Sequence, residues 1–233
     1  MVREMGSKVA LDEFYGLTPS EKEISLLYLG YSGVLVGIGG KYVLFDPADM
    51  LKGAEESLKE LYAVFYTHGH YDHFHLDSAK RIFEVTNAFF IAEESVYDEI
   101  RGFVPDNKRF LARVGEFRVG ELNVSVVEGL HVGKIMLFRI SSDTWSLFHG
   151  GDSNYVPLPF GADIAILPTG RPSPTASPEA ALKMALDLKP KVVIAVHGSD
   201  AQHKALQKLL SERLPEVKFL APEQMAPTKL SFK

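Results

Sequence analysis

The sequence contains no cysteine among its 233 residues. This absence excludes disulfide bonds, thiol nucleophiles and cysteine-ligated zinc sites, and it suits a cytoplasmic protein. No apolar run approaches the roughly 20 residues of a membrane-spanning helix. The first 25 residues carry scattered charges in place of the apolar segment of a signal peptide. We therefore expect a cytoplasmic protein that does not act at a membrane.

Positive charge is also scarce, because 25 Lys and Arg residues oppose 30 Asp and Glu residues and leave a net charge of −5. This balance argues against an electrostatic surface for nucleic acid, although it leaves room for a small basic pocket. No internal repeat, low-complexity tract or linker is visible. We therefore expect one domain over residues 24–233, preceded by an N-terminal arm of residues 1–23. The sequence does not decide between a monomer and an oligomer.

Short apolar runs between glycine, proline and charged turns predict two β regions, at residues 24–45 and 109–148. Short helices are expected at residues 12–15 and 55–62. The segment 177–179, Ser-Pro-Glu, predicts the start of a longer helix, because it offers a capping hydroxyl, a proline at the first helical position and an acid in the first turn. The chain is therefore of the α/β (α+β) class.

The densest chemical pattern lies in the stretch 67–73, which reads Thr-His-Gly-His-Tyr-Asp-His. It follows an apolar run that predicts a buried strand, so it lies on a loop at the carboxyl end of that strand, where ligand sites of open α/β sheets usually lie. Residues two apart on an extended segment point the same way. His68, His70 and Asp72 can therefore face one pocket, and His73 joins them as the chain turns. Imidazoles and a carboxylate suit zinc or a similar divalent ion, and this density disfavours a merely solvated turn.

This pattern resembles the His-x-His-x-Asp-His signature of the metallo-β-lactamase superfamily. In that superfamily a further histidine, a bridging aspartate and a last histidine follow later strands. Here His131, Asp152 and His197 each come shortly after an apolar, strand-like run, in the same order. The resemblance covers about residues 24 to 200. It implies a four-layer αββα sandwich and two divalent ions, zinc or alternatively manganese.

The resemblance also implies a role for each ligand. His68, His70 and His131 hold one ion, Asp72, His73 and His197 hold the second, and Asp152 bridges them. A hydroxide bound to the two ions is then expected to attack a small ester, lactone or phosphoester. Asp72 is the candidate catalytic residue, since its carboxylate can orient the nucleophile or carry its proton.

Among the branches of the superfamily, the chain is most similar to lactonase-like metal-dependent hydrolases, which include ascorbate-phosphate lactonase. The similarity rests on short segments such as 29–30, Leu-Gly, 46–47, Asp-Pro, and 167–168, Leu-Pro. Two alternatives stay open. One is a compact phosphodiesterase or nuclease that acts on nucleotides, and the other is a metal-bearing scaffold without turnover. Asp46 either supports the metal loop by accepting a hydrogen bond from an imidazole or simply occupies a turn before proline.

Loops at the same strand ends supply the candidates for binding a small-molecule substrate, namely Tyr31, Asn154, Tyr155 and Arg171. Arg171 lies in a proline-rich loop and is the fixed positive charge of this set. A guanidinium there can clamp a phosphate or carboxylate, which predicts an anionic substrate, although an exposed loop arginine is the plainer alternative. His203 falls on an amphipathic helix, and we expect it at the surface.

Overall fold

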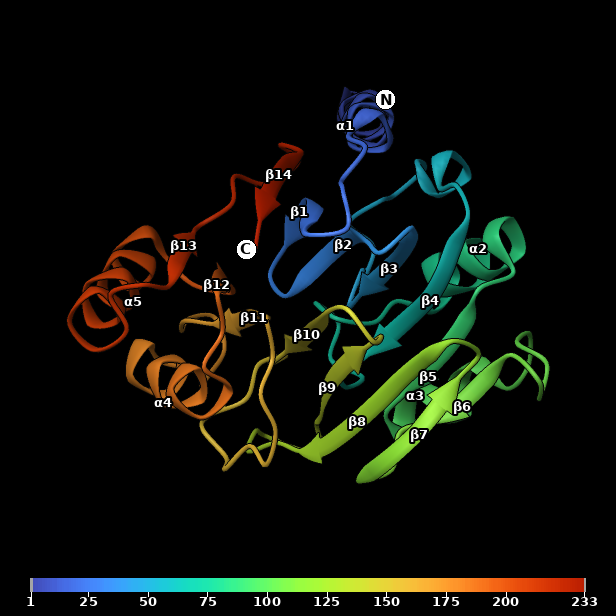
Figure 1. The fold of residues 1–233 in the computed structure, drawn as a ribbon. Helices are drawn as coiled ribbons and strands as arrows, with labels where there is room; N and C mark the ends of the chain where they lie inside the picture. The colour runs from blue at the N-terminus through green and yellow to red at the C-terminus, as the bar shows by residue number, and fades with distance from the viewer. Residues whose placement is uncertain (1, 233) are drawn as a thin grey trace. The chain divides into compact units, whose positions relative to one another are not determined.

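The computed structural model describes residues 2–232, which form two mixed seven-stranded sheets with flanking helices (Figure 1). The chain divides into two compact units. The first runs to Ala112 and includes Glu223–Ser231, and the second contains Arg113–Pro222. No helix of the described residues has the length and apolar character needed to cross a bilayer.

The sheet of the first unit has the order β14-β1-β2-β3-β4-β5-β6. Strands β14, β1, β2 and β3 are antiparallel neighbours, whereas β3, β4, β5 and β6 run parallel. Since β1 and β3 run in the same direction as β4, the loops after all three strands leave the same edge of this sheet. The strands are β1 (Glu23–Gly30), β2 (Gly33–Ile38), β3 (Lys41–Phe45), β4 (Leu61–Tyr66), β5 (Phe89–Ala92), β6 (Arg109–Leu111) and β14 (Thr228–Ser231).

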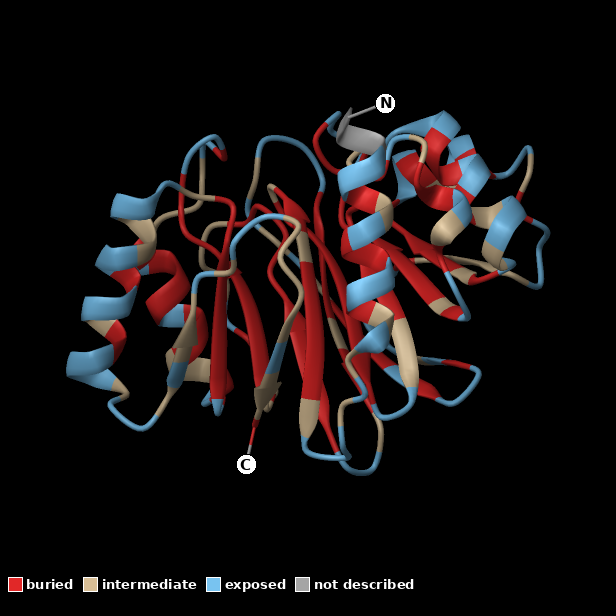
Figure 2. Cartoon of the chain, turned by 90° about the horizontal axis from the view of Figure 1, so that it is seen from above, coloured by how far each residue is buried: buried red, intermediate tan, exposed pale blue. Residues whose placement is uncertain are grey.

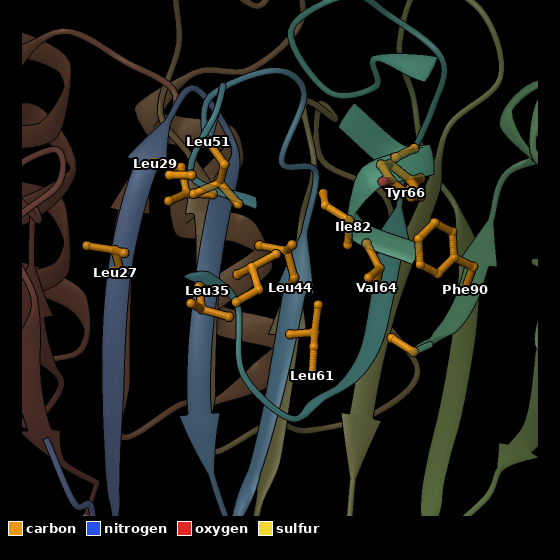
Figure 3. Packing of buried hydrophobic residues seen from close by; sticks show 14 of the residues in the cluster. Leu27, Leu29, Leu35, Leu44, Leu51, Leu61, Val64, Tyr66, Ile82 and Phe90 are labelled. Carbon is orange, nitrogen blue, oxygen red and sulfur yellow. The ribbon is translucent and has the colours of Figure 1, made fainter. Parts of the chain in front are cut away.

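One face of this sheet carries a row of apolar side chains that crosses five strands in register. Leu27 pairs with Leu35, Leu35 with Leu44, Leu44 with Val64, and Val64 with Phe90. All five are fully buried, and Figure 3 shows them together with Ile82 of helix α2 (Leu76–Thr86). Such cross-strand rows fix the register, because a slip of one residue would turn every side chain to the opposite face. The row therefore holds the carboxyl ends of β3 and β4 in place.

The predicted helix at residues 55–62 is wrong. Only a 3-10 turn, η1 (Glu55–Ser57), forms there, and Leu58 already has an extended backbone. The following residues join β4, which pairs with both β3 and β5, so sheet pairing overrides the local helical pattern. Glu55 is nevertheless buried, and its carboxylate accepts hydrogen bonds from the Gly53 N–H at 2.8 Å and the Ser78 hydroxyl at 2.9 Å. The turn is thereby fastened to helix α2.

The second unit contains a sheet of the order β13-β12-β11-β10-β9-β8-β7. Strands β7 to β10 are antiparallel neighbours, and β10 to β13 run parallel. Both β8 and β10 are antiparallel to β9, so β8 runs in the same direction as β10, β11 and β12, and the loops after these four strands share one edge. The strands are β7 (Gly115–Val119), β8 (Leu122–Glu128), β9 (Met136–Ser141), β10 (Ser146–His149), β11 (Ile164–Pro168), β12 (Val192–Val196) and β13 (Lys218–Leu220).

Helices cover one face of each sheet and keep their outer sides exposed, while most strands are buried (Figure 2). The first unit carries α2 and α3 (Glu94–Ile100), and the second carries α4 (Pro178–Leu188) and α5 (Asp200–Arg213). Helix α4 begins as predicted, with the Ser177 hydroxyl accepting a hydrogen bond from the Ala180 N–H. Helix α5 begins with a reciprocal capping box between Ser199 and Gln202.

The N-terminal helix is longer than the predicted residues 12–15, because α1 spans Val2–Gly16. It ends at Gly16, as expected. Leu11 and Phe14 are fully buried in the core of the first unit, and the ring of Phe14 packs against those of Tyr15 and Tyr42. This helix therefore adds apolar surface to the core that supports β1 to β4.

We expect Phe14→Ala to lower the free energy of unfolding by about 3–5 kcal/mol, because truncation of a buried phenylalanine removes apolar burial and leaves a cavity. Val9→Ala on the same helix is the matched control, since Val9 is 56% exposed, and its effect should stay within about 0.5 kcal/mol. Urea unfolding followed by circular dichroism measures both. Equal losses for the two variants would contradict the packing of α1 described above.

Candidate metal centre

The loop that follows β4 brings the four predicted ligands of the first unit together. His68, Asp72 and His73 are buried, whereas His70 is exposed. His68 Nε2 lies 3.0 Å from His70 Nδ1, and His73 Nε2 lies 3.9 Å from Asp72 Oδ2. Gly69 permits this close loop, since a Cβ there would come within 2.7 Å of the Ser95 hydroxyl oxygen. The local sequence therefore directs four potential ligand groups into a small volume.

Asp46 holds this loop from the neighbouring strand end. It follows β3 directly, is fully buried, and has a left-handed backbone with φ 41°. Its carboxylate accepts hydrogen bonds from the Thr67 N–H and the Thr67 hydroxyl, both at 2.7 Å, and from His73 Nδ1 at 2.9 Å. Asp46 is therefore more than a turn residue before proline, and the prediction that it accepts a hydrogen bond from an imidazole is confirmed.

These hydrogen bonds determine the tautomers of two imidazoles. Thr67 has a single hydroxyl proton, which it donates to Asp46, so its oxygen accepts the N–H of His68 Nδ1 at 3.0 Å. His73 donates its Nδ1 proton to the Asp46 carboxylate. In both rings Nε2 is consequently the nitrogen with the lone pair, which is the form that binds a metal ion.

The second unit supplies the other three predicted ligands from one sheet edge. His131, Asp152 and His197 follow β8, β10 and β12, respectively. His197 Nε2 lies 3.0 Å from Asp152 Oδ2, and both residues are buried. The Nδ1 of His197 donates to the Gly170 carbonyl at 3.3 Å. The Nδ1 of His131 lies 2.8 Å from the Thr175 hydroxyl oxygen.

The backbone of His197 is held in a left-handed conformation, with φ 46°. This conformation is uncommon for residues other than glycine. Its carbonyl accepts hydrogen bonds from the Thr169 N–H at 3.2 Å and the Gly170 N–H at 2.9 Å. The loop after β11 therefore fixes both the ring and the main chain of this histidine.

The donor groups fit a divalent ion. Two nitrogens bound to one tetrahedral zinc ion at 2.0–2.1 Å lie about 3.3 Å apart. The pair His68–His70 at 3.0 Å and the pair Asp152–His197 at 3.0 Å are close to this spacing. Imidazole nitrogens and carboxylate oxygens are ligands that zinc and manganese both accept. Each unit thus contains a set of His and Asp groups suited to metal binding, and most of these groups are buried.

Comparison with known proteins identifies the family. The family described as "Beta-lactamase superfamily domain" matches residues 25–197, a span that contains all seven predicted ligands. The chain belongs to this metallo-β-lactamase superfamily. A relative from Rubrobacter xylanophilus, named a UPF0173 metal-dependent hydrolase, is 30% identical over 170 residues, which are 62% of this chain and 69% of that protein. The chain is accordingly a metal-dependent hydrolase of the superfamily.

Solved structures agree on the fold. Igni18, a metallo hydrolase from Ignicoccus hospitalis, has a TM-score of 0.72 and 22% identity, over 91% of this chain and 100% of that chain. The metallo-β-lactamase-fold protein YhfI from Bacillus subtilis has a TM-score of 0.67 and 15% identity, over 89% and 99% of the two chains. These similarities bear out the predicted fold, whereas the lactonase-like branch stays a prediction.

The substrate residues predicted for this superfamily member lie on the expected loops, and their roles stay predictions. Tyr31 follows β1, is half-buried, and has a left-handed backbone with φ 49°. Asn154 pairs with Leu130 and uses its side-chain oxygen to accept the Tyr155 N–H. The Tyr155 hydroxyl donates to Asp187 at 3.1 Å, and this hydrogen bond raises the pKa of Tyr155. Arg171 is exposed.

His203 is not the surface residue that its helix pattern predicts. It is half-buried, and its Nδ1 lies 3.0 Å from the hydroxyl oxygen of Thr169, the residue that binds the His197 carbonyl. The amphipathic pattern did not reveal this, because Thr169 follows strand β11 and lies 34 residues away in the sequence. His149, also buried, accepts the Gly151 N–H at 3.2 Å and so supports the turn before Asp152.

Burial lowers the pKa of His203, against the opposing influences of Asp200 and the Gly198 carbonyl. The unfolded chain therefore binds more protons than the folded chain below about pH 6.5. The stability that this histidine contributes should be fully present above that pH and should decline as the pH falls towards its folded-state pKa.

We expect His203→Ala to lower the free energy of unfolding by about 1–3 kcal/mol at pH 7.5, because the buried Thr169 hydroxyl loses the shorter of its two hydrogen bonds and keeps only the one to the Val196 carbonyl at 3.4 Å. The difference from the native chain should shrink at pH 5.5. Urea unfolding of chelator-treated protein at both pH values measures it, with the exposed neighbour Lys204→Ala as control. If the stability difference between the native protein and His203→Ala grew as the pH fell, the predicted pH dependence would be wrong.

Proposed function

We propose that the chain is a cytoplasmic dinuclear hydrolase of a small anionic ester, lactone or phosphoester, close in function to the lactonase-like branch. One observation carries this proposal. Four of the five imidazoles predicted as ligands, those of His68, His73, His131 and His197, have their Nδ1 atoms engaged by neighbouring protein groups. The Nε2 atoms of His73 and His197 lie near the buried carboxylates of Asp72 and Asp152. Burying carboxylates and imidazoles in this way is costly unless an ion or partner groups compensate it.

The proposed ligand sets follow the resemblance. One ion would be held by His68, His70 and His131, the other by Asp72, His73 and His197, and Asp152 would be a ligand of both. Zinc is the expected ion, with manganese as the alternative. When bound, the two ions would supply an activated water and polarise the reacting group of the substrate.

The residues of the chain itself would orient this chemistry. Asp72 is buried and has its carboxylate 3.9 Å from His73 Nε2, which suits it to accept and carry a proton. Asp46 keeps Thr67 and His73 fixed through three short hydrogen bonds. Groups held in this way need no rearrangement as charge develops, and that is the main source of electrostatic catalysis.

The anionic character of the substrate rests on Arg171. Its loop is anchored in the second unit, because the hydroxyls of Ser173 and Thr175 both donate to the Asp152 carbonyl at 2.8 Å. Arg171 lies two residues before the first of these anchors and exposes its guanidinium. A carboxylate or phosphate of a bound substrate could therefore meet a fixed positive charge.

A substrate screen tests the proposal directly. Zinc- and manganese-loaded protein would be assayed against lactones, carboxylic esters, thioesters and phosphodiesters, each in a neutral and an anionic form. The proposal expects turnover of an anionic ester, lactone or phosphoester. Cleavage restricted to nucleic acids or dinucleotides would instead favour the phosphodiesterase alternative.

We expect two divalent ions per chain after mild metal loading, because seven ligands are proposed. Asp152→Ala should lose at least one ion, since its carboxylate is proposed to bridge them, and most activity should disappear. Mass spectrometry of metal content measures this, and Asp143→Ala, on an exposed turn, is the matched control. One ion or none in folded native protein would count against the dinuclear proposal.

We expect Arg171→Ala to raise KM for an anionic substrate more than it lowers kcat. This pattern is typical of losing an interaction that stabilises the bound substrate and the transition state equally. The loss should be about 1.5–3 kcal/mol, the range for a hydrogen bond to a charged group. Steady-state kinetics measures it, and Arg213→Ala in the last turn of α5 is the control. An unchanged KM would make Arg171 a solvated loop residue.

A further inference from the structure

The loop between β11 and α4 contains a threonine that contacts two of the proposed ligands. Thr175 Oγ1 lies 2.8 Å from His131 Nδ1 and 2.8 Å from the main-chain oxygen of Asp152. Thr175 is 44 residues from His131 and 23 from Asp152 in the sequence. One hydroxyl therefore joins three separate loops of the second unit.

The directions of these two hydrogen bonds follow from the groups involved. A carbonyl oxygen can only accept, so the single proton of the Thr175 hydroxyl goes to the Asp152 carbonyl. The lone pairs of the same oxygen are then left to accept the N–H of His131 Nδ1. The alternative tautomer would set two lone pairs against each other at 2.8 Å. His131 is thus held with its proton on Nδ1 and its lone pair on Nε2.

We infer that Thr175 is a positioning residue that sets the tautomer and ring orientation of His131 for metal binding. The inference rests on the proposed function, because it takes His131 as a ligand. The Thr67 hydroxyl makes the same kind of contact with His68 Nδ1 in the first unit. Hydrogen-bond partners of metal-binding histidines typically change metal affinity 10–100-fold when they are removed.

The same loop offers a matched control. Ser173 also donates to the Asp152 carbonyl at 2.8 Å, and its hydroxyl oxygen accepts the N–H groups of Thr175 at 3.3 Å and Ala176 at 3.2 Å. Its hydroxyl oxygen also lies 3.4 Å from Thr175 Oγ1, and in the described part of the chain it makes no hydrogen bond to His131 itself. Ser173 therefore supports the loop without determining the proton position on His131.

Thr175→Val, which keeps the shape and removes the hydroxyl, is the main variant, and Thr175→Ser should rescue it. The first readout is the His131 tautomer in metal-free protein, from nitrogen-15 NMR of the ring. The second is zinc affinity, from competition with a chromophoric chelator. We expect Thr175→Val to populate the other tautomer and to bind one zinc ion about 10–100-fold more weakly. Thr175→Ser should stay near the native values.

Two outcomes would overturn the inference. One is a Thr175→Val protein with the native His131 tautomer and zinc affinity. The other is a Ser173→Ala protein that loses as much affinity and changes the tautomer as much as Thr175→Val, because the hydroxyl of Thr175 would then act only through loop structure. The NMR readout needs no metal or substrate. A native protein that binds fewer than two ions would therefore contradict the proposed function and leave the tautomer result standing.

Discussion

The structure of the site depends on what holds the Nδ1 atom of four of its five imidazoles. A histidine binds a metal through one nitrogen, and the group on the other nitrogen selects the tautomer and aims the ring. Every such group comes from the same unit as its histidine. The pairs are His68 with the Thr67 hydroxyl, His73 with the Asp46 carboxylate, His131 with the Thr175 hydroxyl and His197 with the Gly170 carbonyl.

The sheets make these pairings possible. In each unit, strands of the same direction end at one edge, so loops that are distant in sequence are close in space. In the first unit the pairing of β3 with β4 sets Asp46 beside Thr67 and His73. In the second unit the parallel pairing of β11 with β12 sets the 169–177 loop beside His197. The strand register, which the apolar row fixes in the first unit, therefore also determines which groups can form hydrogen bonds to the ligands.

The sequence predicted those parts of the site that depend on neighbouring residues or on the order of segments along the chain. The motif at residues 67–73, the strand before each later ligand and the start of α4 are patterns of neighbouring residues. Partners from other loops were harder to find. Thr175 lies in a proline-rich segment typical of a turn, and its contact with His131 spans 44 residues. The strand β14 pairs with β1 from the opposite end of the sequence, and β4 took residues from a predicted helix because sheet pairing outweighed a weak local preference.

The supporting groups also differ in charge, and this difference bears on the two proposed ions. Behind His73 lies the carboxylate of Asp46, whereas hydroxyls lie behind His68 and His131. A carboxylate acceptor makes an imidazole a more basic ligand than a hydroxyl does. On the proposed assignment, the second ion also has the carboxylates of Asp72 and Asp152, while the first has three imidazoles and shares Asp152. Carboxylates favour harder ions such as manganese, and imidazoles favour zinc. On that assignment, the groups behind the ligands add to the chemical difference between the two proposed ligand sets.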